Sequence, residues 1–171
     1  AVALTGYLAI ARRIDPAIDI PFADMAPGLL AQAEGRRQVG DAAGAKGFLA
    51  VVAKGVSGAP QFKSALAAAY ADLGDLTEAA RWMQDGGNTA ESQAAYALAE
   101  AERGDVAAAR QRLRSLDGSL AVPALAALAR RARDADAARR AARLAEAAPP
   151  GRARAEAFAF AATAAVGMLG P

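Results

Sequence analysis

The chain has 171 residues, of which 54% are hydrophobic, and a formal net charge of +2. It contains no cysteine and no histidine, which excludes thiol and imidazole nucleophiles, Cys/His zinc sites and disulfides. Only carboxylates, hydroxyls, lysine and arginine remain for any chemistry, and the small net charge does not favour nucleic acid as a specific partner.

Alanine dominates the apolar residues: the chain has 53 alanines, whereas only 5% of its residues are aromatic. Alanine is the best helix former and lets helices approach closely. We therefore expect an all-α protein with little volume for a deep cavity. No segment reaches the roughly 20 apolar residues that cross a bilayer, so no membrane span is expected.

The first expected elements are a helix and an extended linker. Apolar residues at helical spacing predict a helix over residues 2–13, which Pro16 ends. Prolines hold their preceding residues out of the α region, so residues 14–21 are expected to be extended. Pro27 suits the first turn of the next helix, which is expected to run to Val39.

Helical hairpins are expected next, each divided by a short polar step. The steps are Gly40-Asp41, Gly74-Asp75, Gly104-Asp105 and a degenerate Arg133-Asp134. Glycine can adopt the left-handed conformation that closes the first helix, and aspartate can cap the second. The expected pairs are 26–39 with 41–54, 60–73 with 75–85, 89–103 with 105–116, and 120–133 with 135–147, followed by a last helix over 152–168.

The spacing of these steps indicates a repeat. Their aspartates are 34, 30 and 29 residues apart, a period typical of α-solenoids with two helices per unit. Residues 60–86 resemble a tetratricopeptide repeat, with Leu66, Tyr70, Gly74-Asp75 and Ala79 in register. The other units match less evenly, since Arg36 and Glu100 stand where the family places an aromatic residue.

The resemblance implies a right-handed α-solenoid of antiparallel helix hairpins with about ten helices. The chain is then a single tetratricopeptide-like domain over residues 1–171. Residues 1–16 would be the closing helix of a preceding repeat and residues 151–171 a terminal helix. The repeats between them are expected at 26–57, 60–88, 89–118 and 119–150.

In the tetratricopeptide family, the first helices of the pairs line a concave groove that accepts extended peptides or helices. The Lys/Asn constellation by which some members clamp a C-terminal carboxylate is missing, which favours a shallow groove for a peptide or helix. The resemblance places the groove at Leu30, Glu34, Arg37, Gln61, Ser64, Ala68, Asp72, Glu91, Ala94, Leu98, Arg130 and Arg131.

Trp82, the only tryptophan, allows two interpretations. It can pack between helices beside Met83. Alternatively, it is an exposed anchor for a partner, because Ala79 and Met83 already supply an inward stripe and tryptophan is enriched at binding hot spots.

Several local motifs lack the pattern of a chemical site. Residues 40–47 have too few residues between the first two glycines for a phosphate loop and no hydroxyl after the lysine. Ser57 lies outside a hydrolase elbow, and Arg103-Gly104-Asp105 falls in an expected turn. Three acids match no EF-hand loop: Asp15, Asp19 and Asp24. We expect no catalytic residue, no metal and no cofactor.

The expected function is a non-catalytic scaffold or adaptor that binds a peptide or helix of another protein. One alternative is a self-associating structural module of a larger assembly, because the helices at both ends carry apolar faces. The other is a carboxylate- or arginine-based enzyme or a binder of anionic ligands. Its candidate arginines are Arg130, Arg131, Arg133, Arg139, Arg140 and Arg143.

The excess of arginine over lysine in an alanine-rich chain is typical of a GC-rich bacterial genome. Both the bacterial cytoplasm and the periplasm are compatible with the sequence, including as the soluble part of an anchored or secreted protein.

Overall fold

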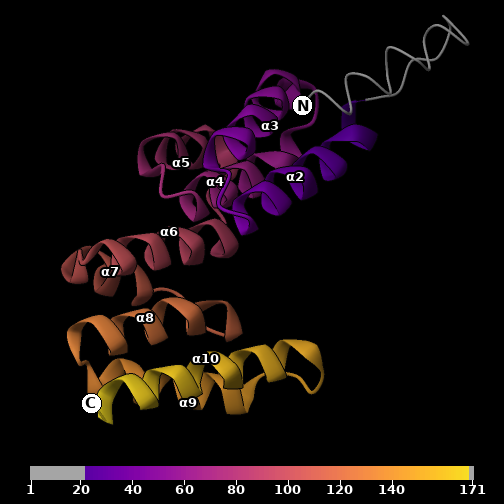
Figure 1. Ribbon diagram of the computed structural model, residues 1–171. Helices are drawn as coiled ribbons and strands as arrows, with labels where there is room; N and C mark the ends of the chain where they lie inside the picture. The colour runs from indigo at the N-terminus through magenta and orange to yellow at the C-terminus, as the bar shows by residue number, and fades with distance from the viewer. Residues whose placement is uncertain (1–21, 170–171) are drawn as a thin grey trace, which may run out of the picture.

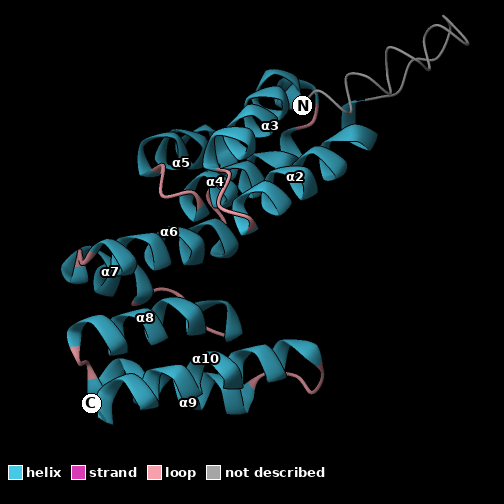
Figure 2. Ribbon diagram, in the orientation of Figure 1, coloured by secondary structure: helices cyan, strands magenta, loops and turns pink. Residues whose placement is uncertain are grey.

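A computed structural model describes residues 22–169 of the chain (Figure 1). In this range the protein is all-helical, with short loops and no strand (Figure 2). The expected helix over 2–13 and the linker over 14–21 lie outside the described residues. The described range holds nine α-helices: α2 (Phe22–Gln38), α3 (Ala42–Gly55), α4 (Lys63–Asp72), α5 (Leu76–Trp82), α6 (Ala90–Arg103), α7 (Val106–Leu113), α8 (Val122–Ala132), α9 (Ala135–Ala147) and α10 (Arg152–Leu169).

Consecutive helices pack as antiparallel pairs, in the order α2 with α3, α4 with α5, α6 with α7 and α8 with α9 (Figure 1). The first helix of each pair also contacts the first helix of the next pair, and α10 contacts both α8 and α9. Short helical turns connect the pairs: η1 (Val56–Gly58), η2 (Pro60–Phe62), η3 (Met83–Gly87) and η4 (Ser119–Ala121). The all-α class and the expected pairing of helices are confirmed.

The turn inside each of the first three pairs is closed by the expected glycine. Gly40, Gly74 and Gly104 have φ angles of 79°, 71° and 85°, which is the left-handed region. In the first of these turns, Gly40 donates its amide to the carbonyl of Arg37 and Asp41 to that of Arg36, both at 2.9 Å. This pair of hydrogen bonds satisfies carbonyls at the end of α2 that lack partners within the helix.

The aspartate after each glycine caps the following helix. Asp41 accepts a hydrogen bond from the amide of Gly44 at 2.8 Å, and Asp105 accepts one from the amide of Ala108 at 3.2 Å. The four first amides of a helix lack partners within the helix, so each cap stabilises the start of a second helix. One dipeptide therefore ends one helix and begins the next.

Two cations also connect one turn to the next. The Nζ atom of Lys46 lies 2.6 Å from a carboxylate oxygen of Asp75, and Arg110 lies 2.7 Å from Asp134. Each cation follows the aspartate of its own turn by five residues. Exposed ion pairs contribute little individually, but these two align the turns of neighbouring pairs.

The fourth turn adopts the same conformation without a glycine. Arg133 has a φ angle of 50° and is the only non-glycine residue among residues 22–169 with a positive φ. Asp134 still donates its amide to the carbonyl of Ala129 at 3.2 Å and accepts from the amide of Ala137 at 3.0 Å. The degenerate step therefore keeps both the closure and the cap, and Arg133 carries the conformational cost.

Helix α2 begins earlier than the sequence predicts. It already includes Phe22, the first described residue, so Pro27 lies inside the helix rather than in its first turn. Phe22 and Met25 pack against the core, and a side chain on Gly55 would meet the Phe22 ring at 2.3 Å. This burial favours the extra turn, because proline removes only one hydrogen bond near the end of the helix.

The core consists of two buried clusters. The first lies among α2 to α5 and contains the larger side chains, and the second lies among α6 to α10 and is built mainly from alanine. Helix α6 belongs to both, because Ala94 and Ala97 are in the second cluster whereas Ala95 and Tyr96 pack against the first. It therefore joins the two halves of the described chain.

Trp82 is a core residue, with only 6% of its surface exposed. The interpretation of Trp82 as an exposed anchor is therefore wrong. Helix α5 is short, and its only other buried residue is Ala79. The indole belongs to the cluster among α2 to α5, and the guanidinium of Arg81 lies 4.8 Å from the centre of its ring.

The fourth turn generates a prediction about stability. Arg133→Gly is expected to increase the free energy of unfolding by about 1 kcal/mol, because glycine adopts the left-handed conformation without a steric cost. Urea unfolding followed by circular dichroism measures the change. Gly104→Arg at the equivalent turn is the matched control and should have the opposite effect. An Arg133→Gly protein no more stable than wild type would contradict the prediction.

Candidate functional site

A hollow of about 430 Å³ lies beside the C-terminal parts of α2, α4 and α6. Three of the expected groove residues line it: Arg37, Asp72 and Leu98. Phe160 of α10 lines it as well and leaves 44% of its surface exposed. We call this space the central hollow.

Small residues keep the central hollow open. Ala71, Ala95 and Ala99 line it from α4 and α6, where larger side chains would fill the space. Three of the twelve residues expected in a groove line this hollow. The charged residues that line the central hollow are Arg37, Asp72, Glu102 and Arg103.

The arginines of the central hollow already have partners. Arg37 donates through Nε and Nη2 to both carboxylate oxygens of Glu34, each at 2.7 Å. This contact lowers the pKa of Glu34 and raises that of Arg37. Arg103 donates to the backbone carbonyl of Gly74, which links α6 to the turn after α4.

Glu102 lines the central hollow and is paired with two arginines of α8. Arg130 binds one carboxylate oxygen, and Arg131 binds the other at 2.9 Å. The two arginines were expected to face the groove. They reach it only through Glu102, whose single carboxylate pairs with both arginines.

Asp72 differs from the other charged residues of the central hollow. No cation among the described residues lies within 4.0 Å of its carboxylate. The side chain is exposed at the surface of the hollow, and atoms of the neighbouring helices desolvate it in part. This desolvation raises the pKa of Asp72, and the charges of Glu34 and Glu91 add to the effect against the opposing charge of Arg37.

The remaining expected groove residues do not join the central hollow. Leu30 and Glu34 line a separate space of about 30 Å³, which has room for little more than one water molecule. Ser64 shares a hydrogen bond with Thr89 at 2.5 Å. Gln61 and Glu91 are exposed in the first turns of their segments, away from the helix ends that line the hollow.

Ala68 and Ala94 are buried, with 9% and 7% of their surfaces exposed. Their assignment to an open groove is wrong. Helices α4 and α6 pack directly against each other, and alanine is small enough to be covered by that contact.

The sequence interpretation missed Glu102, Arg103 and Phe160. A signal for Glu102 exists, since it precedes its turn glycine by two residues, as Asp72 does. No comparable signal exists for Phe160, because its direction depends on how α10 packs on α8 and α9.

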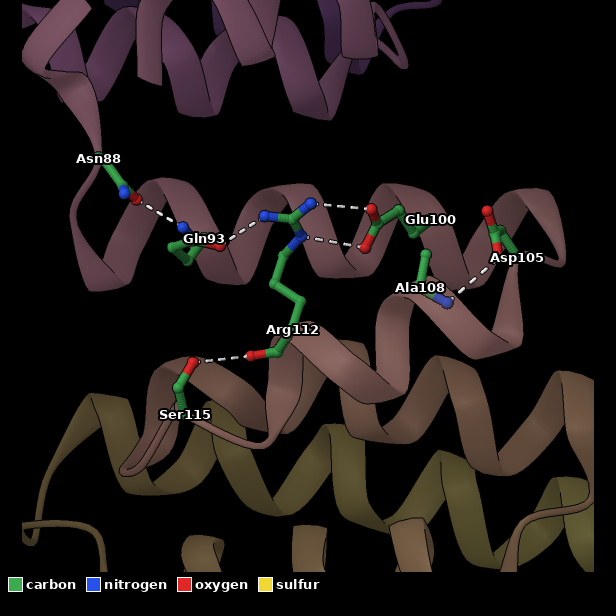
Figure 3. Close-up of polar contacts among 7 residues, drawn as sticks. All are labelled: Asn88, Gln93, Glu100, Asp105, Ala108, Arg112 and Ser115. Carbon is green, nitrogen blue, oxygen red and sulfur yellow. Dashed lines mark hydrogen bonds and ion pairs between the residues drawn. The ribbon is translucent and has the colours of Figure 1, made fainter. Parts of the chain in front are cut away.

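A second polar cluster lies between α6 and α7 (Figure 3). Arg112 donates to both oxygens of Glu100 at 3.0 and 3.1 Å and to Gln93 at 2.7 Å, and it lies 4.2 Å from the centre of the Tyr96 ring. Glu100 is only 6% exposed. These hydrogen bonds connect α6 to α7 and satisfy the buried carboxylate of Glu100.

The C-terminal arginines proposed for an anionic ligand are mostly engaged by protein groups. Arg139 pairs with Asp136 at 2.6 Å, and Arg140 donates to the carbonyl of Leu113 at 2.8 Å. Arg130 and Arg131 bind Glu102, as described above. These contacts occupy guanidinium donors that an anion would otherwise bind.

The fold and these contacts define an all-helical domain of nine packed helices over residues 22–169. No protein-family model matches the chain, and neither the curated proteins nor the solved structures contain a match. None of the described helices combines the length and hydropathy of a membrane-crossing segment. Within the same range, no three acidic side chains gather closely enough to hold a metal ion.

Asp72 and Asp75 generate opposite predictions for the pH dependence of stability. The pKa of Asp72 is above its ordinary value of 3.8, mainly because of burial. The ionised form is therefore less stable in the folded protein than in the unfolded chain. Asp72→Asn should therefore have a larger free energy of unfolding than wild type at pH 7. This gain in stability should disappear below about pH 3.8, where Asp72 is protonated in both the folded and the unfolded chain.

Asp75 is the matched control. The hydrogen bond from Lys46 lowers the pKa of Asp75 below 3.8, and asparagine can still cap the helix. Asp75→Asn should be less stable than wild type at pH 7, and its deficit should vanish as the pH falls through the lowered pKa. Urea unfolding at pH 7 and about pH 3 tests both variants, and the same sign for both would refute the assignment.

Proposed function

We propose that the domain is a tetratricopeptide-like, right-handed α-solenoid that binds a peptide or helix of another protein in the central hollow. The architecture is supported by the succession of contacts between first helices and by the similar turns inside each pair. Such an arrangement presents a curved surface built from the first helices of the units. The role is that of a non-catalytic scaffold or adaptor.

The observation that carries this proposal is the exposed Phe160 in a hollow lined by three first helices. Residues of α2, α4 and α6 lie in the same lining as Phe160. Aromatic side chains in a recess are typical centres of protein-binding surfaces, where truncation often costs more than about 1 kcal/mol. A partner side chain that covered the 44% exposed ring would remove apolar surface from water.

The charges of the hollow support a binding role over hydrolysis by paired carboxylates. Such hydrolysis needs one carboxylic acid and one carboxylate that converge on the substrate. Of the two acids in the hollow, Glu102 is held by two arginines, and Asp72 alone lacks a described cation partner.

The test of the proposed function compares two phenylalanines of α10. Phe158 and Phe160 are equally exposed at 44%, but only Phe160 lines the central hollow. Peptides selected from a random library on the wild-type protein should bind Phe160→Ala about tenfold more weakly, because apolar contact is lost. Their affinity for Phe158→Ala should change less than about twofold.

Fluorescence anisotropy of the labelled peptides gives these dissociation constants. A library that yields no binder would contradict the proposed function. Equal losses of affinity for the two variants would place the binding surface elsewhere on α10.

A second candidate function is self-association through α10. Its exposed residues include Phe158 at 44% and Val166 at 70%, and the only acid on this helix is Glu156. An apolar helix face of this kind is typical of a contact between copies.

Sedimentation velocity decides this second candidate. If copies associate through α10, Val166→Glu should shift the protein toward the monomer by placing a charge in the contact. A wild-type protein that remains monomeric at high concentration would remove the candidate.

A further inference from the structure

The ends of the first helices differ in charge beside the central hollow. The C-terminal end of a helix carries a partial negative charge, which basic side chains in the last turn offset. Helices α2, α6 and α8 all have such residues, whereas α4 has none and ends at Asp72. The basic residues of the other three last turns are Arg36, Arg37, Arg103, Arg130 and Arg131.

The neighbouring arginines form no ion pair with Asp72, although the charge of Arg37 acts on it from a greater distance. Both the Nε and the Nη2 of Arg37 are bound to Glu34, and Arg103 is bound to the carbonyl of Gly74. Among the described residues, the carboxylate of Asp72 therefore lies at the negative end of α4 and forms no ion pair. Partial desolvation raises the pKa of Asp72, so a cation placed beside it would stabilise the ionised carboxylate.

Apolar surface lies in the same hollow as this carboxylate. Leu98 is half-buried, and Phe160 is 44% exposed. A ligand that matches the hollow therefore needs a positive charge and an apolar group close together. An acidic ligand would face Asp72, and the hollow's arginines are already committed to protein acceptors.

We propose that the central hollow binds a partner segment with a lysine or arginine next to an apolar side chain. The cation pairs with Asp72, and the apolar side chain packs against Leu98 and Phe160. This inference rests on the proposed function and specifies the chemistry of the partner that the hollow selects.

The test uses the full chain and two pools of blocked synthetic peptides about twelve residues long. Both pools are randomised over alanine, serine, glutamine and leucine, and they differ only in a fixed central Leu-Lys or Leu-Glu pair. The lysine pool should bind the wild-type protein about tenfold more tightly, as a charge-assisted contact predicts. Fluorescence anisotropy measures both pools.

Substitutions at Asp72 connect the preference to this carboxylate. Asp72→Asn keeps the shape of the side chain and should weaken binding of the lysine pool about tenfold. Asp72→Arg should reverse the preference between the pools. Asp75→Asn removes a nearby carboxylate that does not line the hollow and should leave the preference unchanged. Unfolding curves identify any variant that fails to fold, and Asp72→Asn decides the question by itself if Asp72→Arg does not fold.

The outcomes separate this inference from the proposed function. Equal binding of both pools, or tighter binding of the glutamate pool, overturns the inference, and it leaves the proposed function intact if Phe160→Ala still weakens binding. A lysine preference that persists in Asp72→Asn also overturns it. Binding of neither pool also overturns the inference, whereas the proposed function is overturned only if the random library yields no binder as well.

Discussion

The left-handed turn between paired helices is the constraint on which the rest of the structure depends. Each turn satisfies the carbonyls at the end of one helix and then the amides at the start of the next, within about six residues of chain. Because every first helix ends at such a turn, the ends of α2, α4 and α6 come to lie beside one hollow. Arg37, Asp72 and Arg103 are neighbours there for this reason.

An alanine-rich core determines how closely the helices approach. Ala68 and Ala94 are buried where α4 packs against α6. Other alanines of these helices leave space beside Leu98. Where more volume is needed, individual large residues provide it, as Trp82 does on α5. Larger side chains therefore fill the cluster among α2 to α5, whereas alanine predominates in the cluster among α6 to α10.

The charged residues of the central hollow differ in whether they are paired. Arg37 is paired with Glu34, and Glu102 is paired with two arginines of α8. Asp72 is left at the end of a helix whose last turn has no basic residue. The carboxylate is accessible to a ligand, but its charge is poorly stabilised by the protein. This combination favours a cationic partner and is the basis of the binding chemistry that we propose.

The sequence by itself determined the helices and their turns, because the bonds that define them are local. Even Arg133 could be assigned to a turn, since Asp134 supplies the cap whether or not glycine precedes it. It also placed Arg37, Asp72 and Leu98 among the groove residues, through their position in the helical register. Only the tertiary structure decided that Trp82 is buried and that Phe160 enters the hollow, because exposure depends on which distant helices cover a side chain and in what rotation they pack.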